Sequence, residues 1–107
     1  MEDPLINQAM LLIWELSQGP VTVGEIAKKL PVTRRTLERK FRDALGHTVL
    51  EEINRCHLKR AKRLLNETDL SITEIAAAAG FPSIDTMGNV FRRVYQMSPG
   101  EYRIRHT

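Results

Sequence analysis

Two stretches of this chain repeat each other, and the repeat limits the possible folds more than any other feature of the sequence. Residues 22–27 (TVGEIA) match residues 71–76 (SITEIA) at an offset of 49. After one extra residue, Pro82, the offset becomes 50, and the matching pairs are Thr33 with Ser83, Thr36 with Thr86, Leu37 with Met87, and Phe41 with Phe91. A solenoid requires three or more copies. Two copies therefore predict two similar supersecondary units joined by a middle segment.

The hydrophobic pattern is helical from end to end, because apolar residues recur at steps of three and four and no sustained alternation indicates a strand. Helix starts are marked by hydroxyl–acid capping boxes, by single hydroxyl caps and by cap–proline pairs: Thr22–Glu25, Thr48–Glu51 and Ser71–Glu74; Thr33 and Ser83; Asp3–Pro4 and Ser98–Pro99. We therefore predict an all-α fold with seven helices, over about residues 4–18, 23–30, 34–45, 49–66, 72–79, 84–95 and 99–105.

Each copy has the spacing of a helix-turn-helix. A short helix is followed by a tight turn, at residues 31–32 in the first copy and at residues 80–82 in the second. Small Ala27 and Ala76 allow the second helix of each unit to cross closely, and in this motif the second helix enters the major groove of DNA. We predict a single domain over residues 1–107, with a first helix-turn-helix at about 22–45, a linker helix at about 49–66 and a second helix-turn-helix at about 71–95.

The apolar spacing also assigns the expected core. The second helix of each unit is expected to be anchored by inward packing of Leu37 and Phe41, or of Met87 and Phe91. On the first helix the expected buried residues are Ile6, Met10, Ile13 and Leu16, with Trp14 as a further candidate. On the linker helix they are Leu50, Ile53, Leu58, Ala61, Leu64 and Leu65.

Polar residues between the anchors are the candidate DNA contacts of the first unit. Arg35, Glu38 and Arg39 share one helix face and are expected to contact bases, because arginine can bind guanine O6 and N7 bidentately and a carboxylate can accept from cytosine N4. The alternative for Glu38 is a surface ion pair with Arg34 or Arg39. Contacts to the DNA backbone are expected from Thr33, Arg34, Lys40 and Arg42.

The second unit presents a different set of side chains. Ile84, Asp85, Thr86 and Asn89 are expected to contact bases, since an asparagine can bind adenine N6 and N7 and Thr86 or Ile84 can touch a thymine methyl group. Backbone contacts are expected from Ser83, Arg92 and Arg93. The base-contacting face has no cation, and Gly88 weakens the helix by about 1 kcal/mol relative to alanine. We therefore expect this unit to contribute less affinity or less discrimination than the first.

The basic residues are unevenly distributed, although the net charge is only +3. Ten of the sixteen lysines and arginines lie between Arg34 and Arg63, and four more follow Val90. Such clustering suits a polyanionic partner, and a solvated helical surface is the alternative. On the linker helix, the cations are either solvated or within reach of phosphate: Lys59, Arg60, Lys62 and Arg63.

About 17 linker residues at 1.5 Å each span roughly 25 Å. Packing at both ends brings the recognition helices near the roughly 34 Å between successive major-groove segments on one DNA face.

From about Val21 to Arg103 the chain resembles the AraC/XylS family of transcription regulators. The resemblance rests on seven motifs: residues 33–41 (TRRTLERKF), 46–48 (GHT), 61–65 (AKRLL), 72–76 (ITEIA), 80–81 (GF), 91–93 (FRR) and 98–103 (SPGEYR). It implies a seven-helix domain that sets two recognition helices into adjacent major grooves of a double-stranded operator and recruits RNA polymerase. The family's base-contacting positions fall here on Arg35, Glu38 and Arg39, and on Ile84, Asp85, Thr86, Gly88 and Asn89.

The second unit departs from the usual pattern of this family. Where an aromatic pair and a basic residue are common, the chain has Thr86–Met87 and Asn89. The first unit is most similar to the subgroup of sugar-operon activators that resemble the xylose regulator, which implies activation of a catabolic operon. Family members normally carry an effector-sensing domain. Because only about 20 residues precede the first unit, we expect that domain to be absent here, either because the chain is a separated domain or because it is a short family member.

Two other classes of function fit the sequence less well. An enzyme is not expected, because the chain has no phosphate loop or nucleophile elbow and its three histidines are scattered. Neighbouring Cys56 and His57 point to different helix faces, so we expect no metal site and no cofactor. A helical protein–protein adaptor would differ from a DNA-binding domain in showing little affinity for a duplex even at low salt.

The cellular location is expected to be the cytoplasm. The lone cysteine cannot form an internal disulfide and fits a reducing compartment. The first residues lack the pattern of a secretion signal, and no apolar stretch approaches the roughly 20 residues of a membrane-spanning helix.

Overall fold

The computed structural model of the chain describes residues 3–106, which form an elongated body with principal extents of 43 × 21 × 21 Å. Its helices are α1 (Pro4–Leu16), α2 (Val23–Lys28), α3 (Arg34–Leu45), α4 (Val49–Glu67), α5 (Ile72–Ala79), α6 (Ile84–Tyr95) and α7 (Pro99–Arg105). All seven predicted helices are therefore confirmed, and the described residues contain no strand. Two helices end two residues earlier than predicted: α1 ends at Leu16 rather than at 18, with Ser17 as its C-cap, and α2 ends at Lys28 rather than at 30, with Lys29 as its C-cap.

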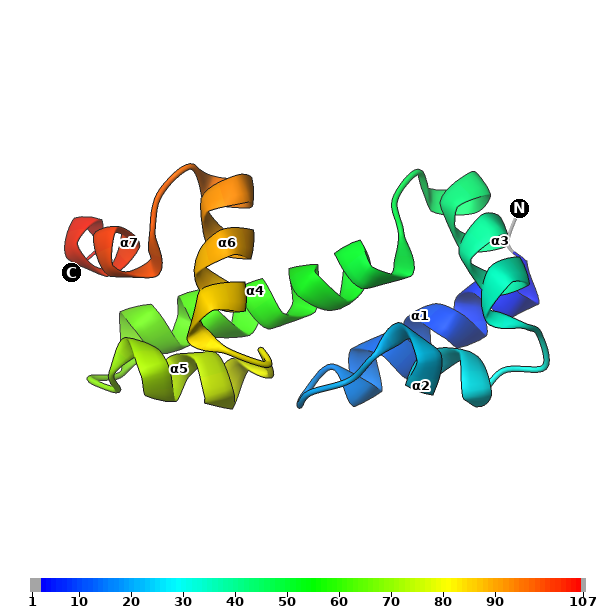
Figure 1. The fold of residues 1–107 in the computed structure, drawn as a ribbon, viewed down its shortest axis with the longest axis horizontal. Helices are drawn as coiled ribbons and strands as arrows, with labels where there is room; N and C mark the ends of the chain where they lie inside the picture. The colour runs from blue at the N-terminus through cyan, green and yellow to red at the C-terminus, as the bar shows by residue number, and fades with distance from the viewer. Residues whose placement is uncertain (1–2, 107) are drawn as a thin grey trace.

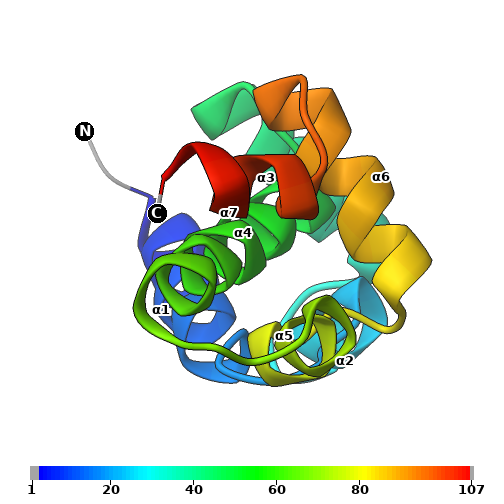
Figure 2. The same cartoon turned by 90° about the vertical axis from the view of Figure 1, so that its left-hand side faces the viewer.

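The long helix α4 runs through the molecule and carries a helix-turn-helix at each end (Figure 1). Viewed end on, it lies in the middle with the other helices placed around it (Figure 2). The core is divided accordingly into two hydrophobic clusters. Val49 and Ile53 of α4 pack with α1, α2 and α3, whereas Leu58, Ala61 and Leu65 pack with α5, α6 and α7. Each helix-turn-helix thus folds against its own half of one shared helix.

Two residues expected in the core lie on the surface instead. Trp14 is 50% exposed and Leu50 is 52% exposed. Ala9 and Val49 occupy the corresponding buried positions, because each lies on the face of its helix that meets the neighbouring helices. Met10, Leu16 and Leu64 are only partly buried at the edges of the clusters.

The three predicted capping boxes are present at the starts of α2, α4 and α5. A fourth, between Ser98 and Glu101 at the start of α7, was not recognised from the sequence beyond its Ser98–Pro99 signal. It lies 50 residues after the box of Thr48, so the repeat continues past the helix-turn-helix into the helix that follows it. In the boxes of α4, α5 and α7, backbone N–H donation from the cap residue lowers the pKa of Glu51, Glu74 and Glu101.

Candidate nucleic-acid interface

The two recognition helices, α3 and α6, rise roughly parallel from opposite halves of α4, on the same side of it (Figure 1). Each is anchored by two completely buried side chains, Leu37 and Phe41 in α3 and Met87 and Phe91 in α6. The predicted anchors are confirmed. Because they fix which side of each helix points inward, the residues between them are turned outward.

Both recognition helices begin in the same way. Thr33 accepts a hydrogen bond from the Thr36 backbone N–H at 3.2 Å, and Ser83 accepts one from the Thr86 backbone N–H at 3.0 Å. In each case the two hydroxyls are also hydrogen-bonded to each other, at 3.1 Å in α3 and 3.0 Å in α6. The predicted caps are confirmed, and matching caps give the two helices matching first turns.

The outward side of α3, which we call the first reading face, consists of Arg35, Glu38, Arg39 and Arg42. The three arginines are exposed and Glu38 is partly buried. Glu38 accepts a hydrogen bond from the Arg34 Nε at 3.4 Å, so the ion pair considered as its alternative role is formed in this structure. The pair is exposed and therefore weak. DNA could replace it at little cost.

The outward side of α6, the second reading face, consists of Ile84, Asp85, Gly88, Asn89 and Arg92, which line one hollow together. Ile84, Asp85, Asn89 and Arg92 are exposed, whereas Thr86 is partly buried and points toward the first unit, where it lines the cleft between the units.

Arg92 adds a cation to the edge of this face, beyond the residues Ile84, Asp85, Thr86 and Asn89 among which none was expected. The Arg92 guanidinium extends back along the helix, and its two Nη atoms lie 3.7 and 3.9 Å from the position that a Cβ on Gly88 would occupy. The absence of a side chain at Gly88 leaves this space open. Arg92 was predicted to contact the DNA backbone. It lines the same hollow as Asp85 and Asn89.

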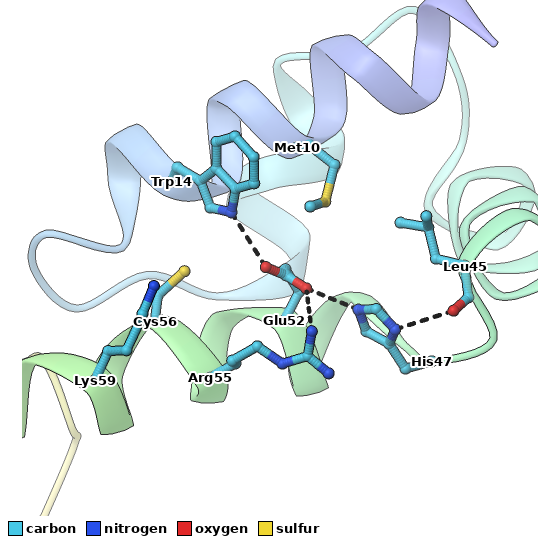
Figure 3. Close-up of a pocket in the computed structure, with 8 residues that line it drawn as sticks. All are labelled: Met10, Trp14, Leu45, His47, Glu52, Arg55, Cys56 and Lys59. Atoms are coloured by element: carbon cyan, nitrogen blue, oxygen red, sulfur yellow. Dashed lines mark hydrogen bonds and ion pairs between the residues drawn. The ribbon is translucent and has the colours of Figure 1, made fainter. Parts of the chain in front are cut away.

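A polar network holds the end of α3 against α4 and α1 (Figure 3). The Glu52 carboxylate, only 4% exposed, accepts a hydrogen bond from the Trp14 Nε1 at 3.1 Å and lies 2.7 Å from the His47 Nε2 and 3.7 Å from the Arg55 Nη1. The His47 Nδ1 lies 3.2 Å from the Leu45 carbonyl, and its ring meets the Phe41 ring edge on at 5.6 Å. The network joins the last residues of the first recognition helix to the linker.

An aromatic cluster holds α6 in place in the second unit. The Phe91 ring lies 4.8 Å from the Tyr95 ring and 5.4 Å from the Tyr102 ring, both at steep interplanar angles. Arg103 holds α7 against the end of α4 and the segment that follows it, because its guanidinium donates hydrogen bonds to the carbonyls of Leu65, Leu70 and Thr68 at 3.3, 2.6 and 3.1 Å.

Two buried polar residues of α4, Glu52 and His57, were not found by sequence reasoning. Both lie on the apolar side of the helix, at a step of three or four from the buried Val49 and Ile53. That spacing was available as a signal, but a charged or titratable residue is expected at the surface unless a partner is known. The partners, Trp14 and His47 for Glu52 and Gly19 for His57, come from other segments.

The described residues show no cluster of metal ligands, no activated thiol and no membrane-spanning helix. Residues 3–106 contain no group of three or more His, Cys, Asp or Glu side chains able to hold a metal ion. Burial raises the pKa of the Cys56 thiol, so its reactive thiolate form is disfavoured. None of the described helices combines the length and the apolar character required to cross a bilayer.

Comparison with known proteins assigns the chain to a family. Residues 26–105 match the helix-turn-helix domain family of the AraC type. The chain belongs to the AraC-type helix-turn-helix family. It is therefore a helix-turn-helix DNA-binding domain of the kind found in transcription regulators, and its homologues are transcriptional regulators rather than enzymes.

Relatives and solved structures agree with this AraC-type assignment. The xylose operon regulatory protein of Haemophilus influenzae is 36% identical over 104 residues, which are 97% of this chain and 27% of that protein. The structure of the xylose-binding transcription activator xylR has a TM-score of 0.76 at 32% identity, over 100% of this chain and 28% of that one. The DNA-binding domain of AdpA, solved in complex with a target DNA, has a TM-score of 0.85 at 28% identity, over 96% of this chain and 93% of that one. The chain thus spans about a quarter of the length of the xylose operon regulatory protein that it matches.

Proposed function

We propose that this AraC-type domain binds an operator by placing α3 and α6 in two successive major-groove segments on one face of the DNA. The observation that carries the proposal is that two equivalently capped and anchored helices stand on the same side of one continuous helix. The 19 residues of α4 are about 28 Å long at 1.5 Å per residue. Packing at each end extends this toward the roughly 34 Å between successive major-groove segments.

In this arrangement the first reading face supplies base contacts from Arg35, Glu38 and Arg39. Ile84, Asp85, Thr86 and Asn89 supply them from the second unit. The Thr86 hydroxyl is hydrogen-bonded to Ser83, which supports a methyl contact to thymine rather than a hydrogen bond to a base. Contacts to the DNA backbone come from Thr33, Arg34, Lys40, Arg42, Ser83, Arg92 and Arg93. The position of Arg92 above Gly88 also supports a base contact from Arg92.

The regulator to which this domain belongs activates transcription of a catabolic, sugar-related operon. It does so in the cytoplasm, by recruiting RNA polymerase. Support for this comes from the xylose operon regulatory protein and the xylose-binding activator to which the chain is similar. A reporter gene placed behind a selected operator would test this activation. We expect transcription of the reporter to increase when the regulator that contains this domain is expressed. Lowered transcription would show a repressor instead.

DNA binding itself is tested by selecting sites from random duplexes and measuring affinity by fluorescence anisotropy across a range of salt. Affinity should fall steeply between about 50 and 200 mM salt, because neutralising each phosphate releases counterions. Arg39→Ala should weaken the selected site far more than Lys59→Ala, which removes the same charge from an exposed position beside Trp14 and Cys56. Equal effects of the two variants would contradict a base contact by Arg39.

A further inference from the structure

A buried histidine in α4 lies where the two helix-turn-helix units meet. His57 is only 2% exposed. Its Nε2 lies 3.0 Å from the carbonyl oxygen of Gly19, in the turn before α2. Its ring also meets the ring of Phe81, in the turn between α5 and α6, at 5.4 Å and a steep angle. Figure 1 shows these two turns facing each other beside the middle of α4. One side chain therefore contacts a segment of each unit.

Gly80 makes this contact possible. A Cβ at Gly80 would lie 2.6 Å from the His57 Nε2, 2.8 Å from its Cδ2 and 3.0 Å from the Gly19 carbonyl carbon. Any larger residue would push the histidine and the first unit away. The backbone of Gly80 is also left-handed, with a φ of 97°, which favours glycine. Linker, first unit and second unit thus come together at His57, Gly19 and Gly80, which we call the His57 bridge.

The bridge lies between the residues expected to meet DNA. His57 and Gly80 line a cleft of about 780 Å³ between the units, and the same cleft is lined by Arg34 of α3 and by Thr86 and Asn89 of α6. The two hydrophobic cores have no residue in common. Packing within each core therefore fixes each unit on α4 but does not tie one unit to the other.

A carbonyl oxygen can only accept a hydrogen bond. The contact with Gly19 therefore requires the ring proton of His57 to be on its Nε2. Burial lowers the pKa of His57, which keeps the ring neutral near pH 7. The bridge is therefore a neutral hydrogen bond supported by close packing, and it does not depend on an ion pair that salt would screen.

We propose that the His57 bridge fixes the orientation of the two recognition helices relative to each other and thereby sets the half-site spacing that the domain accepts. His57 is a positioning residue and makes no DNA contact itself. A domain whose two recognition helices are already aligned loses less freedom on binding, and so binds a correctly spaced site more tightly. The inference rests on the proposed binding of two half-sites.

The test is an affinity profile over duplexes in which the two selected half-sites are moved by −1, 0, +1 and +2 base pairs, together with duplexes in which one half-site is scrambled. Wild-type protein should prefer one spacing sharply. His57→Ala should lose about fivefold at that spacing and less at the others, while its binding to each single half-site stays within twofold of wild type. His57→Gln, whose amide can donate to the Gly19 carbonyl, should recover part of the preference.

Arg103→Ala is the matched control, because it loosens the second unit at α7, away from the bridge, and should leave the shape of the profile unchanged. Circular dichroism checks folding. Where His57→Ala is unfolded, His57→Leu fills similar space without a donor and takes its place. A folded variant with the wild-type spacing profile would overturn the role of the bridge, as would equal losses at every spacing. A wild-type protein that ignores the second half-site would instead refute the proposed function.

Discussion

The first and second helix-turn-helix units share a frame but differ in the side chains that they expose. Their caps, their buried anchors and the capping boxes of the helices that follow correspond along the repeat. The first recognition helix exposes cations along its length, Arg34, Arg35, Arg39, Lys40 and Arg42. The second has Arg92 and Arg93 near its end and an asparagine and an aspartate before them. Residues that form the helix are repeated, whereas residues free to meet DNA have diverged.

The supports behind the two helices have diverged as well. Glu52 and Tyr102 stand at corresponding positions, four residues after the caps Thr48 and Ser98. In the first unit this position anchors a polar network with Trp14 and His47, and in the second it completes an aromatic cluster with Phe91. Two chemically different solutions hold equivalent helices in place.

The largest expected effect tests whether the two frames are equally important for stability. Phe41→Ala and Phe91→Ala should each lower the free energy of unfolding by about 3–5 kcal/mol, because both rings are completely buried. Urea unfolding followed by circular dichroism measures the change. A large loss in one variant and a loss below about 1 kcal/mol in the other would show that the frames are not equivalent.

The next effect separates the two reading faces. Arg39→Ala should cost about 1–3 kcal/mol of binding and relax the preference at one base pair of the first half-site. Asn89→Ala should cost less and relax a position in the second half-site. Anisotropy on duplexes with single base-pair changes measures both. A larger cost for Asn89→Ala would reverse the ranking of the units.

A smaller effect separates backbone contacts from base contacts on the first reading face. Arg42→Ala should weaken binding to all duplexes alike and should reduce the slope of log affinity against log salt by about 1, as the loss of one phosphate contact does. The measurement is the salt dependence for selected and scrambled duplexes. If Arg42→Ala altered base preference and Arg39→Ala did not, the face of α3 that meets DNA would be the wrong one.

The His57 bridge should make the free energy of unfolding depend on pH. Burial first, and then the charge of Arg60, lower the pKa of His57 in the folded state, against the opposing hydrogen bond to Gly19. The unfolded chain, with an ordinary histidine pKa of about 6.5, then binds the extra proton first as pH falls. The histidine's contribution is therefore intact above about pH 6.5 and is lost below it. Unfolding free energies from pH 8 to 5 should show a smaller decline for His57→Leu, and an unchanged decline would contradict this origin.

The smallest effect concerns how the two recognition helices end. Corresponding residues Gly46 and Gln96 cap α3 and α6 in left-handed conformations, with φ values of 78° and 57°. Gln96→Gly should stabilise the domain by about 0.5 kcal/mol, because relief of the left-handed strain outweighs the entropy of the added glycine. Gly46→Ala should destabilise it by about 1 kcal/mol. Thermal unfolding checks both, and the same sign for the two would show that the ends are not equivalent.

The repeat, the caps and the apolar periodicity were sufficient to predict the seven helices and the four anchors, because these depend on local sequence. Trp14 and Leu50 were assigned to the core wrongly, since periodicity gives a helix face but not where the neighbouring helix stops covering it. The buried Glu52 and His57 depend on partners from α1 and from distant turns. The place of Arg92 depends on the empty space at Gly88, which only the three-dimensional packing reveals.

Hydroxyl-radical footprinting on a selected duplex tests most directly whether two equivalent helices occupy successive grooves. The proposed arrangement gives two protected patches about 10 base pairs apart on one face of the DNA, and Arg39→Ala should weaken protection at the patch of the first half-site more than at the other. A single patch, or two patches on opposite faces of the duplex, would contradict it.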